Sequence, residues 1–123
     1  MKNVTILSLA LIPLISSCAF QQVSYQNDVI PIINNKCVEC HAPPNGNGYR
    51  ATGLVMDSYD ALMQGSVYGP IIVAGDSKRS VLNMLVEGRA GNVQKSLHNS
   101  GNALTDDEIQ LFRAWVEQGA LDN

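Results

Sequence analysis

Two cysteines and a histidine stand together in the stretch Cys37-Val38-Glu39-Cys40-His41. Two thiols separated by two residues and followed at once by an imidazole are the pattern for covalent attachment of haem. Each cysteine sulfur can add to one vinyl group of the macrocycle, and the histidine then lies beneath the iron as its proximal ligand. The motif therefore predicts one covalently attached haem c, held by Cys37, Cys40 and His41.

Three other uses of a CxxC pair agree less well with the rest of the chain. A thioredoxin-like redox pair belongs beside a βαβ pattern, which this sequence does not show. A zinc site needs four ligands, and the remaining candidates Cys18 and His98 are widely scattered. A disulfide between Cys37 and Cys40 would be strained. Haem attachment is therefore the interpretation that we favour.

The start of the chain has the composition of an export signal. Lys2 supplies a positive charge, and residues 4–15 are mostly apolar but too few to span a bilayer as a helix. Two serines and Cys18 follow, an ending that resembles a bacterial lipobox, in which the cysteine is lipidated and becomes the mature N-terminus. We therefore expect a signal peptide over residues 1–17 and a lipid on Cys18. The alternative is an ordinary secretory signal with an incidental cysteine.

The export signal and the haem motif support each other, because covalent haem attachment of this kind takes place on the exported side of the membrane. Removal of residues 1–17 leaves 123 − 17 = 106 residues, enough for one small domain. We expect the lipidated cysteine and a short tether over residues 18–24 and the domain over residues 25–123. The predicted location is the periplasmic side of a bacterial membrane. Ala19, rather than aspartate, follows Cys18 and favours the outer membrane.

The charge of the mature chain argues against nucleic acid as a partner. Seven Lys and Arg against eleven Asp and Glu give 7 − 11 = −4, once Lys2 is removed with the signal. No basic patch and no alternation of aromatic and basic residues is present. The expected partners are redox proteins of the cell envelope, and the membrane through the lipid on Cys18.

Short helices must position the haem motif. Hydrophobic periodicity and turn residues predict an all-α chain with four short helices, two long loops and no sheet. The predicted helices are residues 28–40, 59–64, 78–87 and 106–118, and the predicted loops are residues 42–53 and 88–103.

Capping residues give the clearest helix boundaries. Asp28 suits the N-cap of the first helix, which would deliver the cysteines to the core. Ser58 and Gly65 suit the two ends of the second helix. Thr105 and Glu108 have the spacing of a capping box at the start of the last helix.

Several stretches, together with the CxxCH motif, resemble one known family. They are residues 28–32, 37–41, 53–59, 75–76, 80–82, 104–109, 115–116 and 119–120. They cover nearly all of the mature chain and are similar to a small class I c-type cytochrome, in particular to planctomycete-type cytochrome c domains. The resemblance implies an all-α, class I cytochrome c-like fold around one haem, and single-electron transfer as the function.

The chain departs from this family at the sixth iron ligand. Family members usually carry a Met-Pro pair in the loop before the last helix, and that methionine binds the iron. Residues 93–101 contain no methionine. His98 lies in this loop and is the only histidine besides His41, so we favour it as the distal ligand. Met84 is the alternative, although core packing would also explain it, and a vacant or water-bound site is the third option.

Two further residues are candidates for contact with the haem. Trp115 needs a partner for its indole N–H if it is buried, and a haem propionate is one option. Arg50 would pair with a propionate as well, with a solvated side chain as the alternative.

The sixth ligand decides between the functions that the motif allows. An iron with two protein ligands predicts an electron carrier rather than an enzyme. An open iron would instead permit a haem-based sensor or a peroxidase-like enzyme, which also needs acid–base groups over the iron. We favour a membrane-anchored monohaem cytochrome that transfers single electrons.

Overall fold

The computed structural model describes residues 21–91, 98 and 103–123. The predicted signal peptide and Cys18 lie outside these residues. The described helices are η1 (Tyr25–Val29), α1 (Ile30–Lys36), α2 (Asn47–Thr52), α3 (Tyr59–Gln64), α4 (Val81–Val86) and α6 (Asp106–Glu117). Within the described part no strand occurs, and one isolated antiparallel bridge joins Ser66 to Gly69. The prediction of an all-α chain is confirmed there.

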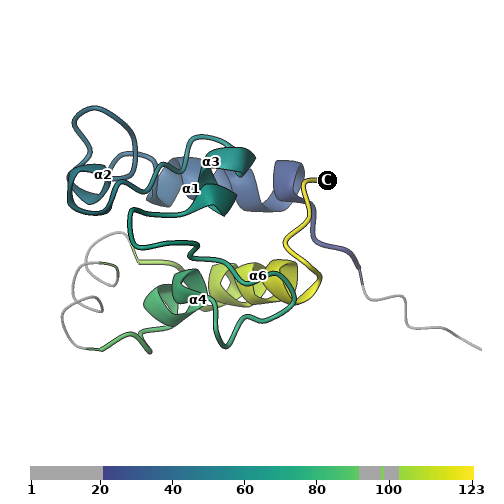
Figure 1. Ribbon diagram of the computed structural model, residues 1–123. Coiled ribbons are helices and arrows are strands. Elements are labelled where there is room, and N and C mark those ends of the chain that lie inside the picture. Colours follow the sequence, from purple (N-terminus) through teal and green to yellow (C-terminus); the bar gives the residue numbers. More distant parts are fainter. Residues whose placement is uncertain (1–20, 92–97, 99–102) are drawn as a thin grey trace, which may run out of the picture.

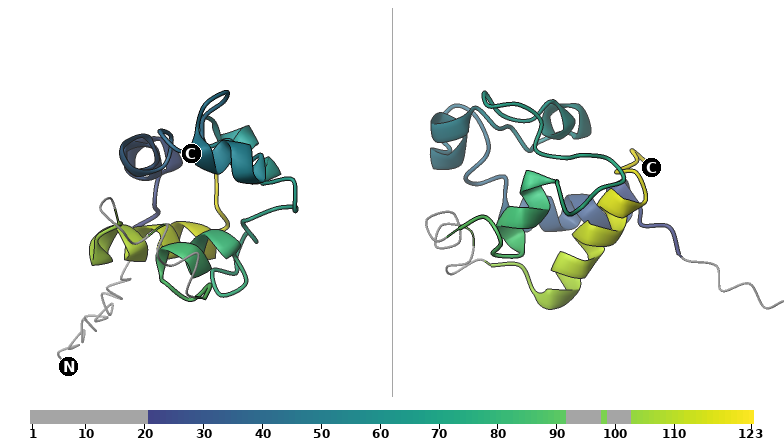
Figure 2. Two further views of the ribbon diagram at one scale, coloured as in Figure 1. Left: turned by 90° about the vertical axis from the view of Figure 1, so that its left-hand side faces the viewer. Right: turned by 60° about the horizontal axis from the view of Figure 1, so that its bottom comes forward.

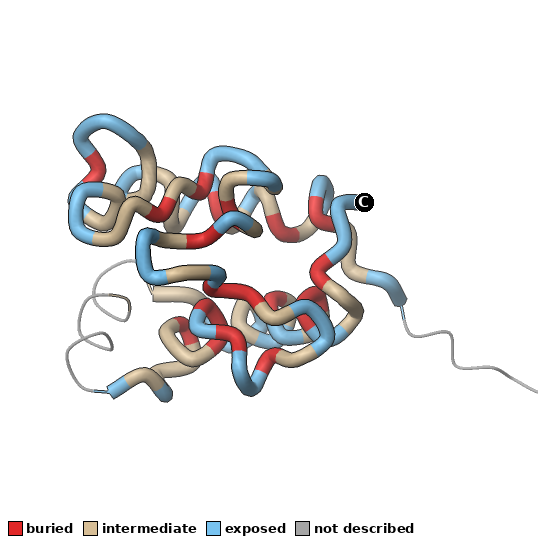
Figure 3. The backbone as a smooth tube through the Cα atoms, viewed as in Figure 1, coloured by how far each residue is buried: buried red, intermediate tan, exposed pale blue. Residues whose placement is uncertain are grey.

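The helices lie in two layers, with α1, α2 and α3 in one layer and α4 and α6 in the other (Figures 1 and 2). Buried positions occur along both layers, whereas the loop before α2 is largely exposed (Figure 3). Among the described helices, none has the length and hydrophobicity needed to cross a membrane.

The first helical segment begins earlier than predicted, and Asp28 is not its N-cap. The side chain of Ser24 accepts a hydrogen bond from the Asn27 N–H and caps η1, a single π-helical turn. Asp28 instead accepts from the Ser24 N–H at 2.8 Å, so the two side chains close the start of the helix reciprocally. The prediction was wrong because Ser24 precedes Asp28 by one turn and satisfies the first free N–H groups.

Helix α1 also ends earlier than predicted, at Lys36 rather than Cys40. Pro31 lies in its first turn, where the missing N–H is not needed. The backbone N–H groups of Cys40 and His41 then donate to the carbonyl oxygen of Cys37 at 3.1 and 2.9 Å. The CxxCH motif is therefore a tight turn that follows the helix.

The predicted irregular loop over residues 42–53 contains a short helix, α2. Glycines and prolines led us to expect no regular structure, but most of them lie at the edges of this helix. Gly46 is its N-cap and Gly53 its C-cap, with a φ of 67° that glycine adopts without strain. The prediction failed because these residues punctuate a helix here instead of replacing it.

Three predicted helices agree better with the structure. Ser58 caps α3 and Gly65 ends it, as predicted. The capping box of α6 is present, since Thr105 and Glu108 each accept a hydrogen bond from the other's backbone N–H. The third helix is shorter than predicted, because the hydroxyl of its N-cap Ser80 bonds to the backbone of Val73 and Asp76.

Aromatic side chains form the centre of the core. Trp115 and Phe112 of α6 are fully buried, and their ring centroids are 6.5 Å apart. Tyr25 of η1 stacks on Trp115 at 5.5 Å and meets Tyr59 of α3 edge-on at 5.1 Å. Burial raises the pKa of Tyr25 to about 12, so this ring stays neutral. The cluster holds both layers together.

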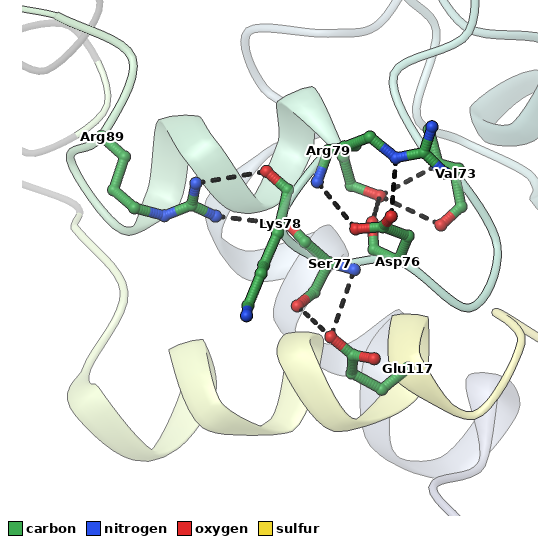
Figure 4. Close-up of polar contacts among 8 residues, drawn as sticks. Val73, Asp76, Ser77, Lys78, Arg79, Arg89 and Glu117 are labelled. Atoms are coloured by element: carbon green, nitrogen blue, oxygen red, sulfur yellow. Dashed lines mark hydrogen bonds and ion pairs between the residues drawn. The ribbon is translucent and has the colours of Figure 1, made fainter.

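Polar contacts attach the segment before α4 to α6. The hydroxyl of Ser77 donates to Glu117, and Arg89 donates to the carbonyl oxygens of Ser77 and Lys78 at 3.3 Å each (Figure 4). Arg113 of α6 reaches Glu87 beside α4 at 3.0 Å. These contacts fix the lower layer as a unit.

The capping box of α6 should contribute measurably to stability. We expect Thr105→Ala to lower the free energy of unfolding by about 1 kcal/mol, because the Glu108 N–H loses its side-chain acceptor. Urea unfolding followed by circular dichroism measures this change. The matched control is Gln110→Ala at an exposed position of the same helix, which should stay within about 0.5 kcal/mol of the unaltered protein. Equal losses in both variants would contradict the role of the cap.

Candidate functional site

The CxxCH turn lies at the end of α1 with its reactive groups accessible. Cys37 and Cys40 are both free thiols, Cys40 exposed and Cys37 half-buried. The Cys37 N–H donates to the Ile33 carbonyl oxygen at 2.8 Å, which anchors the turn to the buried face of α1. His41 is half-buried next to them. The structure thus presents both thiols and the imidazole from one short turn.

Helix α2 and the residues after it hold His41 in place. The Tyr49 N–H donates to the Cys40 carbonyl oxygen at 2.9 Å, and the Met56 N–H donates to that of His41 at 3.0 Å. Gly48 packs so closely on the imidazole that an added Cβ would lie 2.6–2.9 Å from its ring atoms. Glycine is therefore required at position 48 if the ring is to keep this place.

Burial sets the electrostatics of the site. It lowers the pKa of His41, an effect that His98 reinforces and the nearby Leu54 backbone opposes. It also raises the pKa of Cys37 to about 11, with Cys40 and Glu108 acting in the same direction. The imidazole is thus favoured in its neutral form, the form that binds metal ions.

The structure brings His98 to His41, as the search for a distal ligand suggested. Their ring centroids are 6.3 Å apart, and the ring planes are inclined by 20°. Two imidazoles that bind one metal ion from opposite sides, each nitrogen about 2 Å from the metal, have centroids roughly 6 Å apart. The separation of His41 and His98 therefore matches two ligands of a shared ion. Met84, the alternative, lies half-buried on α4.

The remaining candidate residues lie in different surroundings. The indole N–H of Trp115 donates to the Leu121 carbonyl oxygen at 3.0 Å, so the chain itself supplies the partner that we expected from a propionate. Arg50 is exposed on α2. Sequence reasoning missed Gly48, whose only signal was its place among the glycines and asparagines after the motif.

The comparisons with known proteins agree with this site. Residues 37–93, which begin with the first cysteine of the motif, match the family model described as planctomycete cytochrome C. The chain carries a cytochrome c-like domain that resembles the planctomycete type. The resemblance inferred from the sequence is therefore confirmed over this segment, which is somewhat under half of the 123 residues. No curated protein and no solved structure matches the chain.

The residues of the cytochrome c-like domain fit the haem c that such domains generally bind. The Nδ1 atom of His41 is buried without a hydrogen-bond partner in the described part of the chain, and such orphaned atoms point to a missing group or a missing rearrangement. Both thiols are free to form thioethers. A second imidazole faces the first at a metal-sharing distance. Cys37, Cys40, His41 and His98 are the residues that would hold the group.

Gly48 should control the position of the proximal imidazole. We expect Gly48→Ala to displace the His41 ring, because the new methyl group would overlap it. Weaker ligation should then appear as a larger fraction of high-spin ferric haem in the absorption spectrum. Ala51→Ser, at an exposed position of the same helix, is the control and should leave the spectrum unchanged. An unaltered spectrum in Gly48→Ala would refute this role.

Proposed function

We propose that the protein is a membrane-anchored monohaem cytochrome c that transfers single electrons in the bacterial cell envelope. The observation that carries the proposal is the approach of the His98 ring to that of His41, immediately beside two free thiols. The family match over residues 37–93 supports the same conclusion.

Cys37 and Cys40 would attach the haem. The S–H bond of each thiol adds across one vinyl group, so that sulfur bonds to one carbon and the hydrogen goes to the other. The addition needs no external oxidant or reductant. The bound group supplies the one-electron chemistry of iron, whereas the chain supplies position, ligands and exclusion of water.

His41 and His98 would be the axial ligands. Two neutral imidazoles occupy both axial positions and leave no coordination site for peroxide or for a diatomic ligand. Ligand identity also sets the reduction potential, which methionine opposite histidine raises. Histidine at this position therefore favours a carrier of lower potential than a cytochrome with the usual methionine.

Export and lipidation complete the proposal. We infer a signal peptide over residues 1–17 and a lipid on Cys18, with the domain over residues 25–123 on the periplasmic side of the membrane, preferably the outer membrane. The support is the sequence of residues 4–18 and the need for an exported compartment in which haem can be attached.

Replacing both motif cysteines should abolish covalent attachment. We expect the Cys37→Ser, Cys40→Ser double variant to lose its haem to acidified organic solvent, because no thioether remains. Intact-protein mass spectrometry should find one haem on the unaltered protein and none on the variant. Cys18→Ser is the matched control, which should keep its haem but no longer be recovered with the membranes. A haem that survives loss of both thiols would refute the attachment.

Replacing the distal histidine should open the iron. We expect His98→Ala to convert a low-spin ferric spectrum to a high-spin one and to allow carbon monoxide to bind the reduced protein. His98→Met should stay low-spin at a higher reduction potential, because thioether replaces imidazole.

A low-spin spectrum in His98→Ala would rule out His98 as the distal ligand. In that case Met84→Leu identifies whether Met84 holds the position. Rapid carbon monoxide binding by the unaltered protein would instead favour a haem-based sensor or a peroxidase-like enzyme.

A further inference from the structure

The two ends of the described chain are joined at one end of the molecule. The backbone and side-chain oxygens of Asn123 accept hydrogen bonds from Ser24, Tyr25 and Gln26 at 2.8–3.0 Å. The Val23 N–H donates to the side chain of Gln118 at 2.7 Å. Residues 21–26 therefore leave the domain beside its C-terminal segment (Figure 1).

The haem motif lies at the opposite end. The elements η1 and α1 run continuously from Tyr25 to Lys36, which places the CxxCH turn roughly 18 Å from the start of η1. Figure 1 shows α2, the helix that covers His41, at the end of the molecule away from residues 21–25. A lipid on Cys18 is three residues from Gln21 and hence within roughly 10 Å of it. The membrane-facing end and the haem end are thus different ends.

The surface beside His41 is almost free of charge. Residues 42–56 contain one charged side chain, Arg50, and residues 61–75 contain none. The two segments meet where the Val67 N–H donates to the Thr52 carbonyl oxygen at 2.9 Å, at the end of α2. By contrast, four cationic side chains lie on the segment before α4, just after it or on α6: Lys78, Arg79, Arg89 and Arg113.

Two apolar side chains project from this uncharged surface. Tyr68 is 83% exposed and Val67 is 74% exposed, the two highest values among the large hydrophobic residues described. They form the tip of a turn that the bridge between Ser66 and Gly69 closes. A hollow of about 320 Å³ lies beside the turn, lined by Gly53, Ala61 and Val67 among others.

We propose that this uncharged surface, with Tyr68 and Val67 at its centre, is the docking site for a redox protein that presents an uncharged apolar patch. The partner approaches from the water phase, because the surface lies at the end away from Cys18. The inference rests on the proposed function and names the partner for the same site. Interface centres are depleted in charged residues and enriched in tyrosine, and transient redox contacts are small.

Electron self-exchange of the haem-loaded, full-length protein tests the proposal, since a second copy presents the same uncharged patch. Line broadening in nuclear magnetic resonance spectra of ferric and ferrous mixtures measures the rate. We expect the rate of the unaltered protein to change little with salt. Tyr68→Lys should slow exchange roughly fivefold at low salt, because two like charges then meet in the encounter complex, and added salt should restore much of the rate.

Two further variants separate contact from charge. Tyr68→Ser should slow exchange without introducing a salt dependence, because it removes apolar contact alone. Leu121→Lys, which is 44% exposed at the C-terminal end, should exchange at the unaltered rate. Equal effects of the two lysine substitutions, or no effect of either, would overturn the docking site while leaving the cytochrome function intact. Absence of redox-active haem in the unaltered protein would overturn both.

Discussion

The close packing of α2 on the CxxCH turn is the contact on which the rest of the structure depends. A turn that carries two thiols and an imidazole has no core of its own, so another element must cover it. Gly48 lets α2 approach the His41 ring, and the hydrogen bonds of Tyr49 and Met56 hold the following chain in place. The position of the imidazole then fixes where a second ligand has to arrive, which is where His98 lies.

Features that depend on a few neighbouring residues could be predicted from the sequence. The CxxCH motif, the Ser58 cap and the capping box of α6 each need only local spacing, and all three caps or turns are present. The start of the first helix was misplaced because Ser24 and Asp28 both suit an N-cap, and only their reciprocal bonding selects Ser24. Helix α2 was missed because glycine-rich stretches have weak local preferences, and packing on His41 decides this one.

The candidate site shows the same division between local and long-range information. Cys37, Cys40 and His41 are adjacent in sequence, so their joint chemistry was predictable. The pairing of His98 with His41 spans 57 positions and depends on how two layers of helices meet. Trp115 was assigned a possible propionate, yet its indole N–H bonds to Leu121, a partner that depends on how the chain turns back after α6.

The bonds between residues 21–26 and residues 118–123 also bear on the order of folding. They connect positions 95 to 100 residues apart, so none of them can form until nearly all of the domain has crossed the membrane. Trp115, which packs on Tyr25, is subject to the same delay. During export the cysteines therefore remain on an open chain, and covalent attachment of the cofactor can precede closure of the domain around it.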